Sequence, residues 1–154
     1  MIHAPSILCG SSPFYLRFHN VTVKNQRPVC SVETSRGIRI TVQSQYVKSH
    51  DYPLPGKFLF VYDVLIENVG DTFAQLDSRL WKIVNAHGEV EIITGPGVVG
   101  KFPALNPGQS FTYQSFCPLD TEWGTMEGHF VFQREDQSTF KAAVKRFVLA
   151  DVSG

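Results

Sequence analysis

Apolar and polar residues alternate along the chain in short runs from about residue 38 onward. In the run from residue 58 to 68, every second residue is apolar: Phe58, Phe60, Tyr62, Val64 and Ile66. Asp63 and Glu67 lie on the other face of this run, which indicates that the other face meets water in part. The run that starts at residue 38 follows the same pattern, with Ile38, Ile40 and Val42 opposite Arg39, Thr41 and Gln43. Because a period of two residues is typical of a half-buried strand, the pattern predicts β-strands.

Turn residues separate these runs at short intervals. Pro-Gly pairs stand at 55–56, 96–97 and 107–108, and Gly88 is placed where a hairpin turn needs a positive φ angle. Further alternating runs begin near residues 80, 89, 110, 128 and 139, which makes about seven strands in all. No segment combines a sustained helical period with a cap and a stop, and the twelve Phe residues suit the interior of a sheet. We therefore predict an all-β fold: an antiparallel β-sandwich, immunoglobulin- or fibronectin III-like, with a basic N-terminal extension.

The extension comprises residues 1–37 in this interpretation, and the sandwich domain comprises residues 38–152. Phe14, Leu16 and Phe18 alternate as in a strand, whereas Phe14, Phe18 and Val21 would share one face of a helix. Periodicity does not choose between these two structures.

Charge is distributed unevenly, although 14 basic residues balance 14 acidic ones over the whole chain. Residues 1–50 carry six basic residues and one acidic residue, a net charge of +5, and the remaining residues carry −5. Such a segment could be a solvated flank, or it could bind RNA or an acidic protein through Arg17, Lys24 and Arg27. The first 32 residues contain no acidic residue, which is typical of a mitochondrial presequence. We expect a presequence or a partner-binding arm, in a protein that is mitochondrial or otherwise cytoplasmic.

Little in the sequence points to catalysis. Cys9, Cys30 and Cys117 are odd in number and lack the C-x-x-C pair of zinc or redox sites, which favours a reducing compartment. Cys117 would need a base such as His129 to act as a nucleophile, and a buried apolar thiol is the simpler interpretation. The histidines lack the spacing of a metal site, and no apolar run approaches the roughly 20 residues of a membrane helix. We expect no catalytic residue, no metal, no cofactor and no membrane partner.

The stretch from Gly95 to Gly100, GPGVVG, has the G-x-G-x-x-G spacing of a dinucleotide-binding loop. That motif needs a strand before it and a helix after it. Pro103 and Pro107 would break a helix that began at Gly100, so no helix N-terminus is available for a pyrophosphate. The glycines suit a shaped surface loop instead. A small anion-binding nest beside Lys101 is the alternative.

Five motifs follow one another along the chain. They are the strand Tyr62 to Asn68, the triplet Arg79-Leu80-Trp81, the stretch Gly95 to Gly100 followed by a proline, a strand with Pro107, Gly108, Phe111, Tyr113 and Ser115, and the segment Gly124-Thr125-Met126-Glu127-Gly128. In this order they resemble the ApaG domain family, also called DUF525. The chain departs from the usual residues of that family at Leu80, Lys101 and His129.

The resemblance implies a fibronectin III-like sandwich, in agreement with the alternation. It implies no reaction, because in proteins such as F-box only protein 3 and polymerase-delta-interacting protein 2 the domain is regarded as a protein-binding module. We therefore expect a non-enzymatic interaction module, a subunit or adaptor of a larger assembly such as a mitoribosome. A ubiquitin-ligase-type substrate receptor would need a separate scaffold. The alternative function is a nucleotide- or pyrophosphate-binding protein or hydrolase that uses the loop residues Gly95, Gly97, Val98, Val99, Gly100 and Lys101.

Two side chains are the candidate interaction anchors. Trp123 stands in a polar context, where an exposed aromatic ring suits a binding surface. Arg79, beside Trp81, also suits a structural partner for backbone carbonyls or an acid.

Overall fold

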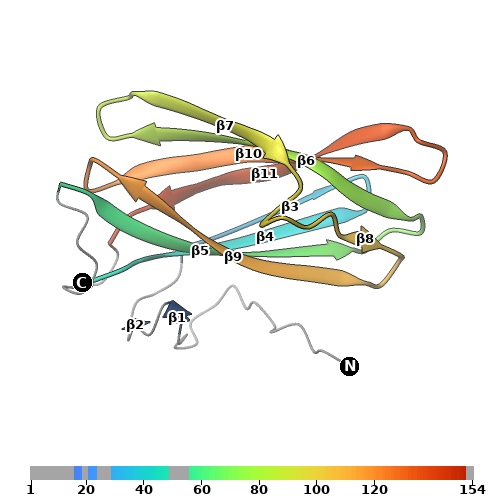
Figure 1. Ribbon diagram of the computed structural model, residues 1–154, viewed down its shortest axis with the longest axis horizontal. Helices are drawn as coiled ribbons and strands as arrows, with labels where there is room; N and C mark the ends of the chain where they lie inside the picture. Colours follow the sequence, from blue (N-terminus) through green and yellow to red (C-terminus); the bar gives the residue numbers. More distant parts are fainter. Residues whose placement is uncertain (1–15, 19–20, 24–28, 49–55, 152–154) are drawn as a thin grey trace.

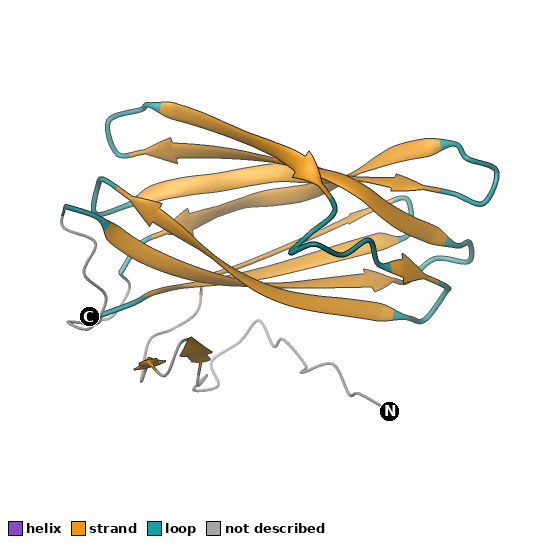
Figure 2. Cartoon of the chain, in the orientation of Figure 1, coloured by secondary structure: helices purple, strands orange, loops and turns teal. Residues whose placement is uncertain are grey.

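The computed structural model describes residues 16–18, 21–23, 29–48 and 56–151. All regular structure in these residues is β-strand (Figure 2). Within these ranges there is accordingly no helix of the length and apolarity that a membrane crossing requires.

The strands follow the chain in the order β1 (Leu16–Phe18), β2 (Val21–Val23), β3 (Val29–Ser35), β4 (Ile38–Tyr46), β5 (Phe58–Asn68), β6 (Ala74–Asn85), β7 (Val90–Pro96), β8 (Ala104–Leu105), β9 (Ser110–Leu119), β10 (Gly124–Gln133) and β11 (Thr139–Leu149). One sheet has the order β3-β4-β5-β9, and the other has the order β11-β10-β6-β7 with β8 added to β6. All pairings are antiparallel. Figure 1 shows the two sheets stacked as layers, so the predicted antiparallel sandwich is confirmed.

One side of the sandwich is closed and the other is open. On the closed side, the Ser44 hydroxyl donates to the Val148 carbonyl at 3.0 Å, and the Ala143 N–H donates to the Ser35 hydroxyl at 3.1 Å. These bonds join β11 to β4 and β3. On the open side, β7 and β9 are the edges of their sheets.

The sandwich begins earlier than the expected boundary between residues 37 and 38. β3 pairs with β4 along its whole length, so that boundary falls inside a hairpin whose turn residues Arg36 and Gly37 have φ angles of 48° and 85°. Alternation does not reveal β3, because the residues of β3 that face the core are the polar Ser31, Glu33 and Ser35. They pair with the apolar core residues of β4. In the extension, residues 16–18 form a strand; Phe14 lies outside the described residues.

The core consists of the apolar faces that alternation predicts. Phe60, Val64 and Ile66 of β5 are fully buried. Trp81 lies at the centre, with its ring centroid 5.6 Å from that of Tyr62, 5.8 Å from Phe130 and 6.1 Å from Phe147. These edge-to-face contacts join rings from both sheets, and aromatic pairs of this kind add to the stabilisation that burial gives.

The outer face of the four-stranded sheet, which points away from the core, meets less water than expected. Six side chains on this face have exposed fractions between 1% and 8%: Thr41, Gln43, Gln45, Leu59, Val61 and Leu65. Asp63 lies among them, and its Oδ1 accepts a hydrogen bond of 3.1 Å from the Gln114 amide while its Oδ2 has no partner. Burial raises the pKa of Asp63 to about 6, and the bond from Gln114 opposes this shift.

The raised pKa of Asp63 predicts that stability falls as the pH rises. The folded state binds the proton more tightly than the unfolded state does, so this contribution is complete below about pH 4 and is lost as the pH passes about 6. Asp63→Asn keeps the oxygen that accepts from Gln114 and removes the buried charge. We expect the variant to be more stable than the native chain by about 3 kcal/mol at pH 7.5 and equally stable at pH 4. Urea unfolding at both pH values measures this, with Glu135→Gln on an exposed turn as control. A stability gain that is the same at both pH values would contradict the prediction.

Candidate functional site

The segment of residues 95–101, hereafter the glycine loop, is a tight hairpin fixed to the core. Val98 and Lys101 exchange two backbone hydrogen bonds of 2.9 and 2.8 Å. Val99 and Gly100 between them have φ angles of 45° and 76°, as in the two-residue turns that suit β-hairpins. The Val98 side chain is fully buried in the core, whereas Val99 is exposed. The loop is therefore a shaped surface element, as the glycines predicted.

The Arg79 side chain forms hydrogen bonds with the backbone at the start of this loop. Its Nη1 donates to the carbonyls of Pro96 at 3.0 Å and Gly97 at 2.7 Å. Gly95 pairs with Arg79 across the two strands, and a Cβ on Gly95 would lie 3.2 Å from two guanidinium nitrogens. The absence of a side chain at Gly95 thus leaves room for the guanidinium. The structure gives Arg79 the role of a structural partner for carbonyls.

Three backbone N–H groups of the glycine loop are used within the protein. Gly97 donates to the Asp77 carbonyl at 2.8 Å, Val98 donates to Lys101, and Lys101 donates to Val98. Pro96 has no N–H to offer. A phosphate cradle needs several free N–H groups that converge on one point. This hydrogen bonding therefore disfavours the anion-binding nest considered for Lys101.

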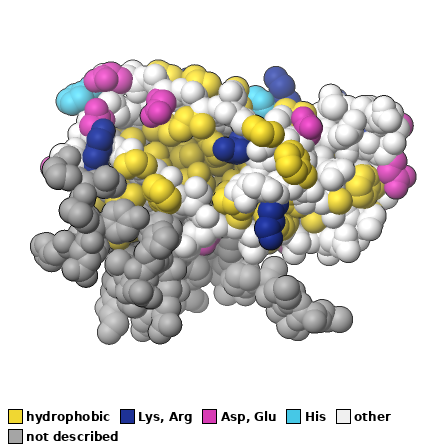
Figure 3. Space-filling view, viewed as in Figure 1, with side chains coloured by type: hydrophobic (Ala, Val, Ile, Leu, Met, Phe, Trp, Pro, Cys, Tyr) yellow, Lys and Arg dark blue, Asp and Glu magenta, His cyan; other side chains and the backbone are white. Residues whose placement is uncertain are grey.

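The loop and the strand before it expose apolar side chains on the open side of the sandwich. Five residues here, which we call the β7 edge, have exposed fractions between 37% and 56%: Val90, Ile92, Ile93, Val99 and Phe102. Figure 3 shows hydrophobic atoms gathered across the middle of this face. The sequence motifs identify Val99 but not the other four residues. The adjacent pair Ile92-Ile93 is the signal for them, because it breaks strict alternation and puts apolar residues on both faces of β7.

The backbone of β7 also has less protection than the edge strands β9 and β11. Among the described residues, β7 pairs only with β6. The edge strand β11 carries Lys141, Lys145 and Arg146, and the edge strand β9 contains Pro118. Charged residues and proline are the usual means of preventing edge-to-edge association. β7 has Glu91 as its single charged residue, with its proline at the last position.

Trp123 lies on a different surface from the glycine loop. It is half-exposed and lines a pocket of about 500 Å³ with Tyr46 and Phe58. Its connection, between β9 and β10, bonds to the far end of β7's hairpin, where the Ala86 N–H donates to the Thr121 hydroxyl at 3.0 Å. The glycine loop begins at the other end of the seven-residue β7, about 20 Å away. The structure therefore does not bring the two candidate anchors together.

The cysteine and histidine considered for catalysis face opposite ways. Cys117 is a buried free thiol on the core side of β9, and burial raises its pKa to about 12 with a smaller contribution from Glu91. His129 alternates with the buried Phe130 and thus lies on the outer side of β10. The interpretation of Cys117 as a buried thiol is confirmed. Cys30, in contrast, is disulfide-bonded. This bond is unexpected for a protein of a reducing compartment, which the odd number of cysteines had favoured.

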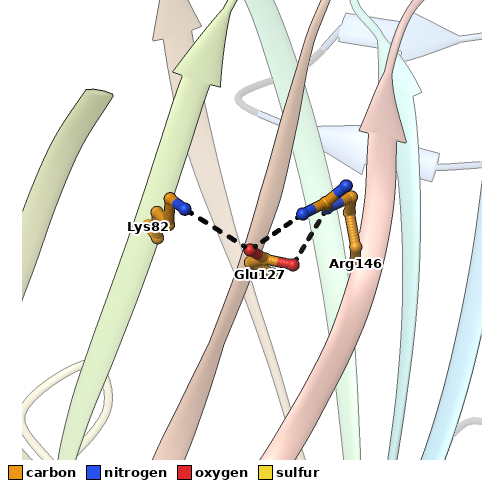
Figure 4. Close-up of polar contacts among 3 residues, drawn as sticks. All are labelled: Lys82, Glu127 and Arg146. Atoms are coloured by element: carbon orange, nitrogen blue, oxygen red, sulfur yellow. Dashed lines mark hydrogen bonds and ion pairs between the residues drawn. The ribbon is translucent and has the colours of Figure 1, made fainter. Parts of the chain in front are cut away.

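The family motifs that resemble ApaG also hold structural positions. The Asn68 amide donates to the carbonyls of Thr72 at 2.8 Å and Leu105 at 2.9 Å. Figure 4 shows Glu127 between Arg146 and Lys82, with an Arg146 Nε–Oε2 distance of 2.9 Å and a Lys82 Nζ–Oε1 distance of 3.9 Å. The hydrogen bond from Arg146 holds the pKa of Glu127 below its usual value. This exposed ion-pair network joins β6, β10 and β11.

The remaining candidates do not form a site with these residues. Arg17 lies in β1, while Lys24 and Arg27 lie outside the described residues. Across the ranges that the structure describes, no three His, Cys, Asp or Glu residues come close enough together to hold a metal ion.

The glycine loop yields a prediction that compares two glycines. Both Gly97 and Gly100 have positive φ angles, but a Cβ on Gly97 would lie 2.4 Å from the Lys101 carbonyl oxygen, whereas one on Gly100 would meet nothing within 4 Å. We expect Gly97→Ala to destabilise the fold by about 3 kcal/mol or more and Gly100→Ala by about 1 kcal/mol. Urea unfolding measures both, and equal losses would show that the contact with Lys101 does not constrain the loop.

Comparison with known proteins supports a single family. The family model described as the ApaG domain, DUF525, matches residues 48–134. Protein ApaG of Methylobacterium sp. strain 4-46 is 44% identical over 115 residues, which cover 75% of this chain and 88% of that protein. Protein ApaG of Anaeromyxobacter dehalogenans strain 2CP-C is 44% identical over 119 residues, which cover 77% and 94%.

Solved structures give the same result. A crystal structure from Bordetella pertussis, described as an ApaA protein, superposes with a TM-score of 0.71 at 36% identity and covers 76% of this chain and 95% of that one. The motifs, the sandwich and these similarities agree, and the chain belongs to the ApaG domain family.

Proposed function

We propose that this protein is a non-enzymatic protein-interaction module whose binding surface is the β7 edge. The observation that carries the proposal is the group of exposed apolar residues on and beside an edge strand whose single charged residue is Glu91. Exposed apolar residues that gather along an edge strand are typical of an interaction site. Arg79 and the buried Val98 hold the adjoining loop in one conformation, so binding would cost little ordering entropy.

The partner in this proposal is an extended segment that adds a strand to β7. Main-chain hydrogen bonds to the unpaired side of β7 would supply affinity, and alternate side chains would supply specificity. On the outer side of the strand, Val90 and Ile92 face the same way as Val84 and Lys82 of β6. The matching segment would therefore place apolar side chains against Val90 and Ile92 at every second position.

We further propose that the protein is a subunit or adaptor of a larger assembly. The acid-free first 32 residues support a mitochondrial ribonucleoprotein such as a mitoribosome, with Arg17, Lys24 and Arg27 in contact with RNA phosphates or an acidic protein. A nucleotide- or pyrophosphate-binding function is the weaker candidate, because the N–H groups of Gly97, Val98 and Lys101 are engaged within the protein.

The substitution Ile92→Glu tests the binding surface. A glutamate at this position lies opposite Lys82, so the fold should keep its melting temperature within about 2 °C while the edge gains a charge. We expect recovery of the native partners with tagged full-length protein to fall at least tenfold. The control is Val148→Glu, which adds the same charge to the exposed face of β11. Equal recovery of the same partners by Ile92→Glu and the native chain would refute the proposal.

The assembly is tested by replacing Arg17, Lys24 and Arg27 together with Gln. If these residues contact RNA, the native protein should sediment with a mitochondrial ribonucleoprotein in a sucrose gradient, and the triple variant should shift to the light fractions. The salt concentration that releases the native protein should exceed the one that releases the variant. Sedimentation of the variant with the same particle at the same salt would exclude the basic extension as the contact.

A further inference from the structure

The outer face of the four-stranded sheet is covered, whereas the outer face of the other sheet is not. The strands β4, β5, β6 and β10 each have a neighbouring strand on both sides. On β6 and β10 the outward side chains are half-buried: Leu80, Lys82, Val84, Thr125, His129 and Val131. On β4 and β5, Gln43 and Val61 point outward and are 1% exposed. Because the strand positions are equivalent, this difference requires a further layer over β4 and β5.

The length of chain available decides what forms this layer. The buried outward residues extend along β5 from Leu59 to Leu65, a distance of about 20 Å. The segment of residues 49–55 is anchored at both ends beside the first of these residues, and its seven residues can fold back over about 15 Å at most. Residues 1–28 precede β3, and their β1–β2 hairpin lies on this side of the sheet in Figure 1. The N-terminal segment alone is long enough.

The cysteines give independent support. Cys30 pairs with Gln43 across β3 and β4, so its side chain lies on the same outer face. It is disulfide-bonded, while Cys117 is a free thiol buried on the core side. The chain has three cysteines, and the remaining one is Cys9, in the N-terminal segment.

We propose that residues 1–28 dock on the outer face of the β3-β4-β5-β9 sheet as a cover, and that a Cys9–Cys30 disulfide fastens it. The disulfide forms when the two thiols give two electrons and two protons to a disulfide oxidant such as oxidised glutathione, which leaves as two thiols. Reduction reverses this exchange and releases the tether. This outer face lies on the other sheet from the β7 edge, so the docking of residues 1–28 is independent of the proposed binding surface.

The polar groups of the covered face contribute little to holding the N-terminal segment. The first 28 residues include Arg17, Lys24 and Arg27 and no acid, whereas the covered face contains the Asp63 carboxylate with an unpartnered Oδ2. The face also buries the Gln45 amide, of which neither Nε2 nor Oε1 has a partner. Buried polar groups without partners weaken an interface. The cover is thus held by apolar burial and by the tether, and loss of the tether should allow it to lift.

Photo-crosslinking in the full-length protein tests the docking. p-Benzoylphenylalanine replaces Val61, which is 1% exposed on the covered face, or Val148, which is 41% exposed on β11. We expect position 61 to crosslink within the same chain to residues 1–28, and position 148 to give no such product. Circular dichroism confirms that both proteins keep the β fold. Crosslinks from position 61 to residues 49–55 or to a second copy, or none at all, would overturn the cover.

The tether is tested by peptide mapping and by reduction. In protein oxidised with oxidised glutathione, mass spectrometry without reduction should find Cys9 joined to Cys30 and Cys117 unmodified. Dithiothreitol, or the substitution Cys9→Ser, should lower the intramolecular crosslink yield from position 61 at least fivefold. A Cys30 that stays a thiol, or crosslink yields that do not change on reduction, would overturn the fastening role of the disulfide.

Discussion

The arrangement of the glycine loop depends on the burial of Trp81 between the two sheets. Its ring meets Tyr62 from β5, Phe130 from β10 and Phe147 from β11, so β6 cannot shift in register without loss of all three contacts. Because side chains two residues apart share a face of a strand, the same register turns Arg79 toward the interior near the open side. There its guanidinium reaches the carbonyls that begin the glycine loop. The loop geometry thus follows from core packing two residues away.

The glycines in GPGVVG illustrate how a motif can have the spacing of a cofactor site and another physical role. Gly95 makes room for a guanidinium, Gly97 approaches the Lys101 carbonyl, and Gly100 completes a two-residue turn. Gly95 and Gly97 are required by close contacts with protein atoms, and Gly100 is favoured by its positive φ angle. The turn and the Arg79 bonds use the donors and acceptors that a nucleotide would need, and they leave hydrophobic side chains at the surface.

The sequence predicts the features that depend on local periodicity. Alternation in residues 58–68 places Phe60 and Val64 in the core correctly, and Pro103 excludes the helix that a dinucleotide site needs. It does not predict β3, because this strand turns Ser31 and Glu33 inward, and its pairing with β4 compensates for the weak pattern. It also does not predict the burial of Val61, since periodicity tells which face a residue lies on but not what covers that face. The exposed state of Ile92 is likewise a consequence of strand order, which places β7 at an edge.

The outer faces of the two sheets differ in their exposure to water. A sandwich buries one face of each sheet and leaves two outer faces and the edge strands to be accommodated. The outer face of the β11-β10-β6-β7 sheet mixes Leu80, Val84 and Val131 with polar residues, and Glu127 links Lys82 and Arg146 across three strands. The outer face of the β3-β4-β5-β9 sheet carries Leu59, Val61 and Leu65 and is covered. The apolar residues along β7 are exposed instead, and for this reason we propose them as the surface that binds a partner.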